Sequence, residues 1–201
     1  MNIFLVAPMG SGKDATAAFL NGYTRLALAD ELKTLAKNLK VNGVAAARLH
    51  LSRLMTVPND TDIKLVEFQK IQLEDTKGRK LLQELGTWAR EHYDYVWIDV
   101  VAHKIRPGKN HCITDVRRLV EFQSFPGFKS VWIQSSKENR IKRIIARDGT
   151  YDPAWENAKS EQEIQMLKPM CDYVLTNDGA LDDLKRSVEH MLAYFEWERT
   201  N

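Results

Sequence analysis

The sequence predicts an α/β fold built on a mostly parallel β-sheet with helices packed on its faces. Three observations predict it: short apolar runs alternate with longer segments of helical periodicity, the first run ends in a glycine-rich turn, and no repeat or low-complexity tract interrupts the pattern. The apolar runs are residues 2–7, 25–29, 111–115, 130–134 and 172–177. Five strands joined by helical crossovers would form a five-stranded parallel sheet flanked by helices.

The first strand is expected over NIFLVA, residues 2–7, because a short continuous apolar run is typical of a strand buried on both faces. A helical pattern follows at 13–20. The second strand, 25–29, leads directly into an amphipathic helix, for which Asp30 is a suitable N-cap.

The remaining elements follow the same alternation. Residues 41–62 are expected to be irregular. Helices are expected at 63–73, 78–93 and 94–105, and after the last three strands at about 117–124, 136–147 and 181–196. The polar span 146–164 is the best candidate for a mobile segment.

Length and composition indicate one globular domain of 201 residues, with a full core or with a small lid in addition. The 29 basic and 27 acidic side chains leave a net charge of +2, which gives no sign of a nucleic-acid-binding surface. Cys112 and Cys171 lie beside apolar runs and are expected to be reduced and buried. The absence of a bilayer-length apolar run or a signal peptide predicts a cytoplasmic protein without a membrane partner.

The turn after the first strand, APMGSGKD (residues 7–14), is close to the phosphate-binding pattern G-x-x-x-x-G-K-[ST]. Gly10 and Gly12, on either side of Ser11, allow backbone N–H groups to turn towards phosphate oxygens. Lys13 adds a positive charge for the terminal phosphates of a nucleotide.

Two residues depart from this pattern, Ala7 in place of glycine and Asp14 in place of serine or threonine. The carboxylate of Asp14 would be repelled by phosphates unless a magnesium ion lies between them or the side chain faces a second substrate. The alternative is an ordinary strand-to-helix turn, in which Asp14 is favoured by its place in the first turn of the helix.

Several stretches, taken in order, resemble the bacteriophage deoxynucleoside monophosphate kinases of the P-loop nucleoside monophosphate kinase superfamily. They are SGKD at 11–14, ALADELKTLAKNL at 27–39, GRKLLQELGTWAREHYDYVWIDVV at 78–101 and CITDVRRLVEF at 112–122. The tail at 172–188 also fits, although dephospho-coenzyme A kinases share its form. The resemblance spans most of the chain, is weak at 41–62, and implies the three-layer P-loop kinase fold with a small lid segment.

Two departures from the family pattern concern the proposed phosphate contacts. Ala15 stands where the family commonly has threonine, so that Thr16 or Ser11 would have to supply the hydroxyl. The family often continues its Asp-Val-Arg segment with Phe-Pro-Asn-Glu, whereas this chain has Arg-Leu-Val before Glu121.

Asp115 and Arg117 are expected at the carboxyl edge of the sheet, where open α/β folds bind ligands. We interpret Asp115 as a carboxylate that organises magnesium together with Asp14, and Arg117 as a clamp on the acceptor phosphate. Glu121 keeps the position of the family's glutamate and is a further substrate-binding candidate. Taken alone, Asp115 and Arg117 are more typical of a helix cap and a surface ion pair, and the neighbouring phosphate-loop motif favours the functional interpretation.

The acceptor is expected to bind on the helix at 78–93, with Arg79, Lys80, Gln83, Gly86 and Thr87 as candidates. Arg79, Gln83 and Gly86 recur at helical spacing and share a face, which would offer a charge, an amide and close approach. Lys80 is equally compatible with a solvated surface. Trp97 is a candidate stacking surface for a base, although a tryptophan in an apolar helix is more often part of a core.

Arg140, Arg143 and Arg147 recur at spacings of three and four on one helical stripe. In nucleotide kinases a stripe of this kind precedes or forms the lid and neutralises the transferring phosphoryl group. The alternative is a solvated basic face.

Together these features predict an enzyme that uses ATP and Mg²⁺ to phosphorylate a deoxynucleoside 5′-monophosphate to the diphosphate. The domain would span 1–201, with an acceptor-binding region at about 41–106 and a lid at about 140–165. The expected catalytic residues are Lys13, Asp14, Asp115, Arg117 and Arg143, and the expected ATP-binding residues are 10–15, Arg140 and Arg147.

Two alternatives remain open. One is a dephospho-coenzyme A kinase or another small-metabolite P-loop kinase, and the other is a P-loop regulatory ATPase that binds partner proteins. The sequence TNDG at 176–179 lacks the lysine of the guanine-binding N-K-x-D motif, which argues against a GTP switch. Small-molecule substrates are expected as partners, a homodimer is compatible with the sequence, and a phage protein would act in the host cytoplasm.

Overall fold

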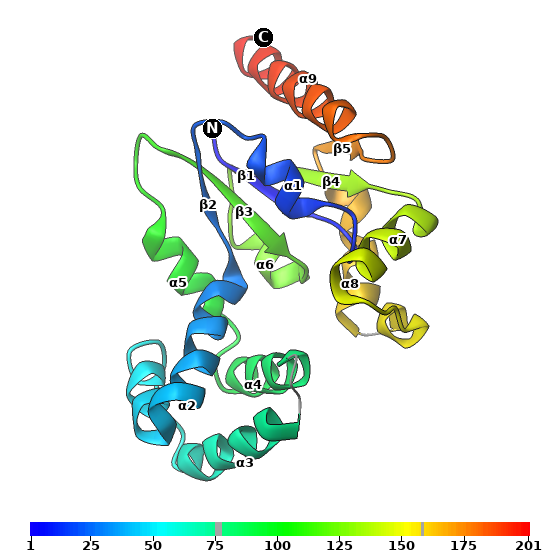
Figure 1. The fold of residues 1–201 in the computed structure, drawn as a ribbon. Helices are drawn as coiled ribbons and strands as arrows, with labels where there is room; N and C mark the ends of the chain where they lie inside the picture. Colours follow the sequence, from blue (N-terminus) through cyan, green and yellow to red (C-terminus); the bar gives the residue numbers. More distant parts are fainter. Residues whose placement is uncertain (75–77, 158) are drawn as a thin grey trace. The chain divides into compact units, whose positions relative to one another are not determined.

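The chain forms two compact units in a computed structural model that describes residues 1–74, 78–157 and 159–201 (Figure 1). The sheet unit comprises residues 1–27 and 106–201, and the helical unit comprises residues 28–105. Each unit is described by itself.

The sheet unit contains a five-stranded, all-parallel sheet with the strand order β2-β3-β1-β4-β5. Its strands are β1 (Ile3–Val6), β2 (Tyr23–Leu26), β3 (Asn110–Val116), β4 (Lys129–Gln134) and β5 (Tyr173–Thr176). This sheet confirms the fold class predicted from the sequence. Because the strands are parallel, the loops that leave β1, β3 and β4 meet at one edge, where ligands bind in such folds.

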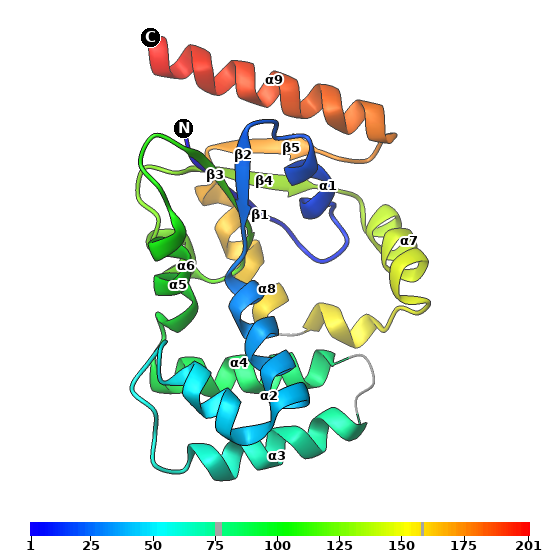
Figure 2. The same ribbon diagram turned by 60° about the vertical axis from the view of Figure 1, so that its left-hand side comes forward.

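Helices cover both faces of this sheet and make three layers (Figure 2). Successive side chains of a strand point to opposite faces. Leu5 of β1 belongs to the buried cluster that includes Phe195 of α9 (Leu181–Thr200), and α1 (Lys13–Ala18) packs against the same cluster. Phe4 points to the other face, where its ring lies 4.9 Å from that of Phe122 in α6 (Leu119–Gln123), and α6 contacts α8 (Lys159–Leu167).

The polar span expected to be mobile contains more regular structure than its sequence suggested. After α7 (Lys137–Asp148) come a 3₁₀ helix, η1 (Pro153–Asn157), and then α8, which is followed by η2 (Lys168–Met170). No helix was predicted at α8. Its apolar side is short, because only Ile164 and Leu167 are buried at helical spacing.

The helical unit consists of α2 (Leu28–Leu51), α3 (Thr61–Glu74), α4 (Arg79–His92) and α5 (Val96–Lys104). The prediction that residues 41–62 are irregular was wrong for 41–51, because α2 continues beyond a kink at Gly43, where φ is 80°, and for 61–62, where α3 begins. Ala47 and Leu51 of this second segment are fully buried, which stabilises it as a helix. Asp30 is also not a cap, since α2 begins at Leu28 and Asp30 lies in its first turn.

His50 joins the two segments of α2 across the kink. Its Nε2 lies 2.9 Å from Glu31 Oε1, and its Nδ1 lies 2.8 Å from Asn38 Nδ2. Lys104 of α5 approaches the other oxygen of Glu31 at 3.0 Å. These polar contacts give His50 a structural role within the helical unit. Across the described ranges, no helix combines the length and the apolarity required to span a membrane.

Candidate functional site

The glycine-rich segment 7–14 comprises the loop between β1 and α1 and the first two residues of α1, and it has glycine at positions 10 and 12. Gly10 and Gly12 have φ values of 80° and 96°, which disfavour other residues. A Cβ atom on Gly10 would lie 2.7 Å from the carbonyl oxygen of Arg140, and one on Gly12 would lie 2.3 Å from Asn177 Nδ2. Both glycines are therefore required by the close approach of neighbouring segments as well as by their conformation.

Lys13 is held against its own loop. Its Nζ donates a hydrogen bond to the carbonyl oxygen of Ala7 at 2.5 Å and lies 3.4 Å from that of Pro8. The ammonium group thus lies inside the loop, and in P-loop proteins a loop of this kind encloses a bound phosphate.

The electrostatic surroundings of Lys13 are mixed. The pKa of Lys13 is lowered to about 7, chiefly by burial and in addition by the nearby positive charge of Arg117. Three carboxylates act in the opposite direction and raise this pKa, in the order Glu161, Asp115 and Asp14. Two cations and three carboxylates therefore gather at the carboxyl edge of the sheet.

Ser11 provides a polar group without a protein partner. Its hydroxyl is buried, and no hydrogen-bond acceptor or donor for it is found within residues 1–74, 78–157 and 159–201. Buried hydroxyls are normally hydrogen-bonded. The Ser11 hydroxyl and the two glycines therefore suit an anion with several acceptor oxygens, such as a nucleotide phosphate.

Asp14 points away from the interior of the loop. Its side chain is 83% exposed and lies 3.7 Å from the guanidinium of Arg25. No group of three or more potential metal ligands occurs in the described part of the chain. Magnesium in phosphate sites is usually held by one or two carboxylates, with phosphate and water completing the shell, so that Asp14 and Asp115 fit this ion.

Glu121 organises the backbone that carries Arg117. One carboxylate oxygen of Glu121 accepts hydrogen bonds from the backbone N–H groups of Arg117 at 2.8 Å and Arg118 at 3.1 Å. The Glu121 side chain was expected to bind substrate, but it accepts hydrogen bonds from the backbone at the start of α6.

Glu161 of α8 joins Arg117 to the loop and was not predicted as a site residue. Its Oε2 accepts a hydrogen bond from the backbone N–H of Met9 at 3.1 Å, and its Oε1 pairs with Arg117 Nη1. The side chain is only 10% exposed. The spacing of Glu161, Ile164 and Leu167 on one helical face was the available signal.

The arginines of α7 reach different partners. Arg140 Nη1 donates to the carbonyl oxygen of Met9 at 3.3 Å, and Arg143 donates to Ser135 Oγ at 3.0 Å and to the carbonyl oxygen of Asn177 at 2.9 Å. Arg147 pairs with the adjacent Asp148 at 2.8 Å, and its side chain is 57% exposed. Arg140 thus braces the loop, Arg143 joins the segments that follow β4 and β5, and Arg147 is open to solvent.

Asn177 and Asp178, also not predicted, tie the segment after β5 to this site. Asn177 Nδ2 donates to the carbonyl oxygen of Ser11 at 2.8 Å. Asp178 Oδ1 accepts from Asn139 Nδ2 at 3.0 Å, Ser136 N–H at 2.7 Å and Ser135 Oγ at 3.0 Å. These hydrogen bonds lower the pKa of Asp178 to about 2, and the one from Asn139 contributes most to this shift.

The predicted acceptor residues lie in the helical unit. Gln83 and Thr87 are exposed, as is Lys80, which lies 3.9 Å from Glu84, while the Arg79 side chain is outside the described residues. Gly86 is buried, and a Cβ there would lie 2.8 Å from a methyl group of Leu32, so any side chain at this position would displace the Leu32 side chain of α2.

Trp97 is in the core of the helical unit at 3% exposure. Its indole N–H, like that of Trp88, has no hydrogen-bond partner among the described residues. The ring therefore lies within the core and not on an exposed surface.

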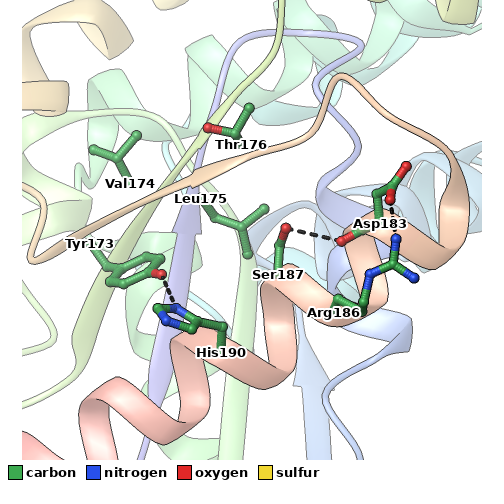
Figure 3. A pocket seen from close by; sticks show the side chains of 8 residues that line it. All are labelled: Tyr173, Val174, Leu175, Thr176, Asp183, Arg186, Ser187 and His190. Carbon is green, nitrogen blue, oxygen red and sulfur yellow. Dashed lines mark hydrogen bonds and ion pairs between the residues drawn. The ribbon is translucent and has the colours of Figure 1, made fainter.

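A separate hollow of about 520 Å³ lies between β5 and α9 (Figure 3). It is lined by Tyr173, Val174, Leu175, Thr176, Asp183, Arg186, Ser187 and His190. Its polar groups are largely paired with one another, since the Tyr173 hydroxyl lies 3.1 Å from His190 Nδ1 and Arg186 pairs with Asp183. None of the residues expected to bind nucleotide lines this hollow.

The lowered pKa of Lys13 predicts proton uptake when a polyphosphate binds. With a pKa of about 7, Lys13 is mostly neutral above that pH and mostly protonated below it, whereas a bound anion favours the protonated form. Binding of inorganic tripolyphosphate should therefore take up nearly one proton more at about pH 8 than at about pH 6. Calorimetry in buffers of different ionisation enthalpy measures this number, and Lys13→Met is the control for protons bound by the ligand. Equal uptake by both proteins at every pH would show that Lys13 does not contact the anion.

Comparison with known proteins supports the fold and gives one partial relative. No protein-family model matches the chain. The dephospho-CoA kinase of Lactococcus lactis subsp. lactis (strain IL1403) is 26% identical over 87 residues, which are 42% of this chain and 40% of that protein. TT1252 from Thermus thermophilus has a TM-score of 0.58 at 20% identity, over 96% of this chain and 97% of that one. A dephospho-CoA kinase from Campylobacter jejuni has a TM-score of 0.49 at 16% identity, over 96% of each chain.

The likeness to TT1252 confirms the predicted three-layer α/β fold. The match to the L. lactis protein spans less than half of either chain, so the activity of that protein supports a proposal for this chain and no more. The finer assignment to the bacteriophage kinases likewise remains a proposal.

Proposed function

We propose that the chain is an ATP-dependent, magnesium-dependent kinase that transfers the terminal phosphoryl group of ATP to a deoxynucleoside 5′-monophosphate. The observation that carries this proposal is the convergence of Lys13 and Arg117 beside a glycine-rich loop that contains a buried, unpartnered hydroxyl within the described residues. Phosphoryl transfer requires two phosphates in line, neutralisation of their charge and exclusion of water, and needs little covalent chemistry from the protein.

The loop at 7–14 would hold the donor. The Lys13 ammonium, which now donates to the Ala7 carbonyl, would turn to the terminal phosphates of ATP, and the Ser11 hydroxyl would gain an acceptor. Because Lys13 is largely shielded from water, its charge would act on phosphate more strongly than an exposed lysine could. Arg140, Arg143 and Asn177 would keep the loop in shape during the reaction.

Asp14 and Asp115 would hold magnesium, which when bound supplies positive charge to the phosphates. The exposed position of Asp14 is compatible with this role, because the ion would separate its carboxylate from the phosphate oxygens. Direct contact of the two anions at 4 Å would cost about 4 kcal/mol at an effective dielectric near 20.

Arg117 would bind the phosphate of the acceptor. A guanidinium can form two parallel hydrogen bonds with a phosphate, which suits Arg117 to this role. Gln83 and Thr87 are exposed polar side chains on α4 that could contact a base. The resemblance of SGKD and of residues 78–101 to the phage kinases supports a deoxynucleoside monophosphate as the acceptor.

A second candidate acceptor is dephospho-coenzyme A. The partial similarity to the L. lactis dephospho-CoA kinase favours it, as does the form of the tail at 172–188. The two candidates share the donor chemistry and differ only in what the helical unit would recognise.

A panel of acceptors tests the proposal. ATP and magnesium are supplied with the ribo- and deoxyribonucleoside monophosphates of the common bases and with dephospho-coenzyme A, and ADP formation is measured. We expect a deoxynucleoside monophosphate to give the highest kcat/KM. Preference for dephospho-coenzyme A would support the second candidate, and ADP formation that no acceptor stimulates would contradict both.

Arg117→Ala should impair use of the acceptor more than use of ATP. Loss of a charged hydrogen bond to the acceptor phosphate should cost about 2–4 kcal/mol in its binding, with a smaller change in the KM for ATP. Arg118→Ala is the matched control, because Arg118 is the next residue and lies 3.9 Å from Glu163 of α8. Equal damage to both substrates would assign Arg117 to a structural ion pair.

A further inference from the structure

Glu161 places a carboxylate among the groups that would bind a substrate phosphate. One oxygen accepts from the Met9 N–H in the glycine-rich loop, and the other pairs with the Arg117 guanidinium. Its charge also raises the pKa of Lys13, so it lies within electrostatic reach of the ammonium group. The loop, the segment after β3 and α8 therefore meet at one buried carboxylate.

These partners are the ones that a phosphate oxygen prefers. A backbone N–H of a glycine-rich loop, a guanidinium and an ammonium all stabilise an oxyanion. Both oxygens of Glu161 are engaged, and its side chain is 10% exposed, so this carboxylate is largely withdrawn from water. An anion that binds to the same donors must compete with it, because each donor would otherwise serve two negative groups.

We propose that Glu161 is an internal counter-anion that occupies the donors for a substrate phosphate and is displaced when the phosphate binds. The inference rests on the proposed kinase function for the identity of the ligand. Glu161 holds the charges of Lys13 and Arg117 together before substrate arrives. It also selects among anions, because a multiply charged phosphate competes with a carboxylate better than a singly charged anion does.

Two substitutions separate displacement from a general effect of charge. Glu161→Gln removes the charge at nearly constant shape. Glu161→Asp keeps the charge but is shorter by one methylene group, so that the carboxylate cannot reach both Met9 and Arg117. Glu163→Gln is the matched control, since Glu163 lies on the same helix, 3.9 Å from Arg118, and its loss changes the net charge equally.

The test measures binding of inorganic pyrophosphate to the full chain by calorimetry at constant ionic strength. We expect Glu161→Gln to bind pyrophosphate about tenfold more tightly than the wild type. Glu161→Asp should also bind more tightly, and Glu163→Gln should bind like the wild type. Thermal unfolding of each variant establishes that it is folded.

Two results would overturn the inference. Wild-type or weaker binding by Glu161→Gln would make Glu161 a brace for the loop. Tighter binding by Glu161→Gln with wild-type binding by Glu161→Asp would show that only the charge at a distance matters.

The acceptor panel is independent of this result. A wild type that phosphorylates an acceptor, while both Glu161 variants bind pyrophosphate like the wild type, refutes the inference alone. Tighter binding by both variants without any kinase activity refutes the proposed function alone.

Discussion

The loop after β1 approaches its neighbours so closely that neither Gly10 nor Gly12 can carry a side chain. The carbonyl oxygen of Arg140 in α7 and the amide of Asn177 after β5 lie where the added carbons would be. Glu161 binds the same loop from α8. Segments from three distant parts of the chain therefore fix the loop, and the position of Lys13 depends on all of them.

This arrangement buries Lys13 near the positive charge of Arg117, which costs free energy. Burial disfavours the charged form of Lys13, and the nearby positive charge of Arg117 adds to this penalty, so the pKa of Lys13 is lowered to about 7. The carboxylates of Glu161 and Asp115 raise this pKa and so offset part of the penalty. A free energy stored in this way is typical of functional sites, because the ligand that relieves it gains binding energy. A stable fold alone gives no reason to bury an ammonium group beside a guanidinium.

The sequence predicted the sheet and the loop well because both depend on local pattern. The strands β1 (IFLV) and β4 (KSVWIQ) are buried along most of their length and stand out as apolar runs, whereas β2, expected at 25–29, lies at Tyr23–Leu26. The loop is a short motif between a strand and a helix. The prediction failed for residues 41–51, which were expected to be irregular although α2 continues through them past a kink at Gly43. The helix α8 was missed because only Ile164 and Leu167 of its apolar face are buried, within a polar span.

The site was predicted in part for the same reason. Lys13 and Arg117 follow β1 and β3, Asp115 lies near the carboxyl end of β3, and parallel strands bring the residues at their carboxyl ends together. Glu161 and Asn177 contact the loop across 152 and 166 residues of sequence. The spacing of Glu161 with Ile164 and Leu167 indicates a helical face but not the segment that this face contacts. Glu121 and Gly86 were predicted to bind substrate. Their described contacts, however, are with the protein itself: Glu121 caps the start of α6, and Gly86 packs against Leu32.

The most direct test of the account is the rate of phosphoryl transfer from ATP in a Lys13→Met variant, with the best acceptor at saturating concentration. If Lys13 neutralises the terminal phosphates, turnover should fall at least about a hundredfold while the fold is retained. Lys142→Met removes an exposed lysine of α7 and should leave turnover unchanged. Turnover of Lys13→Met close to that of the wild type would show that the loop is not the site of phosphoryl transfer, and would contradict the account.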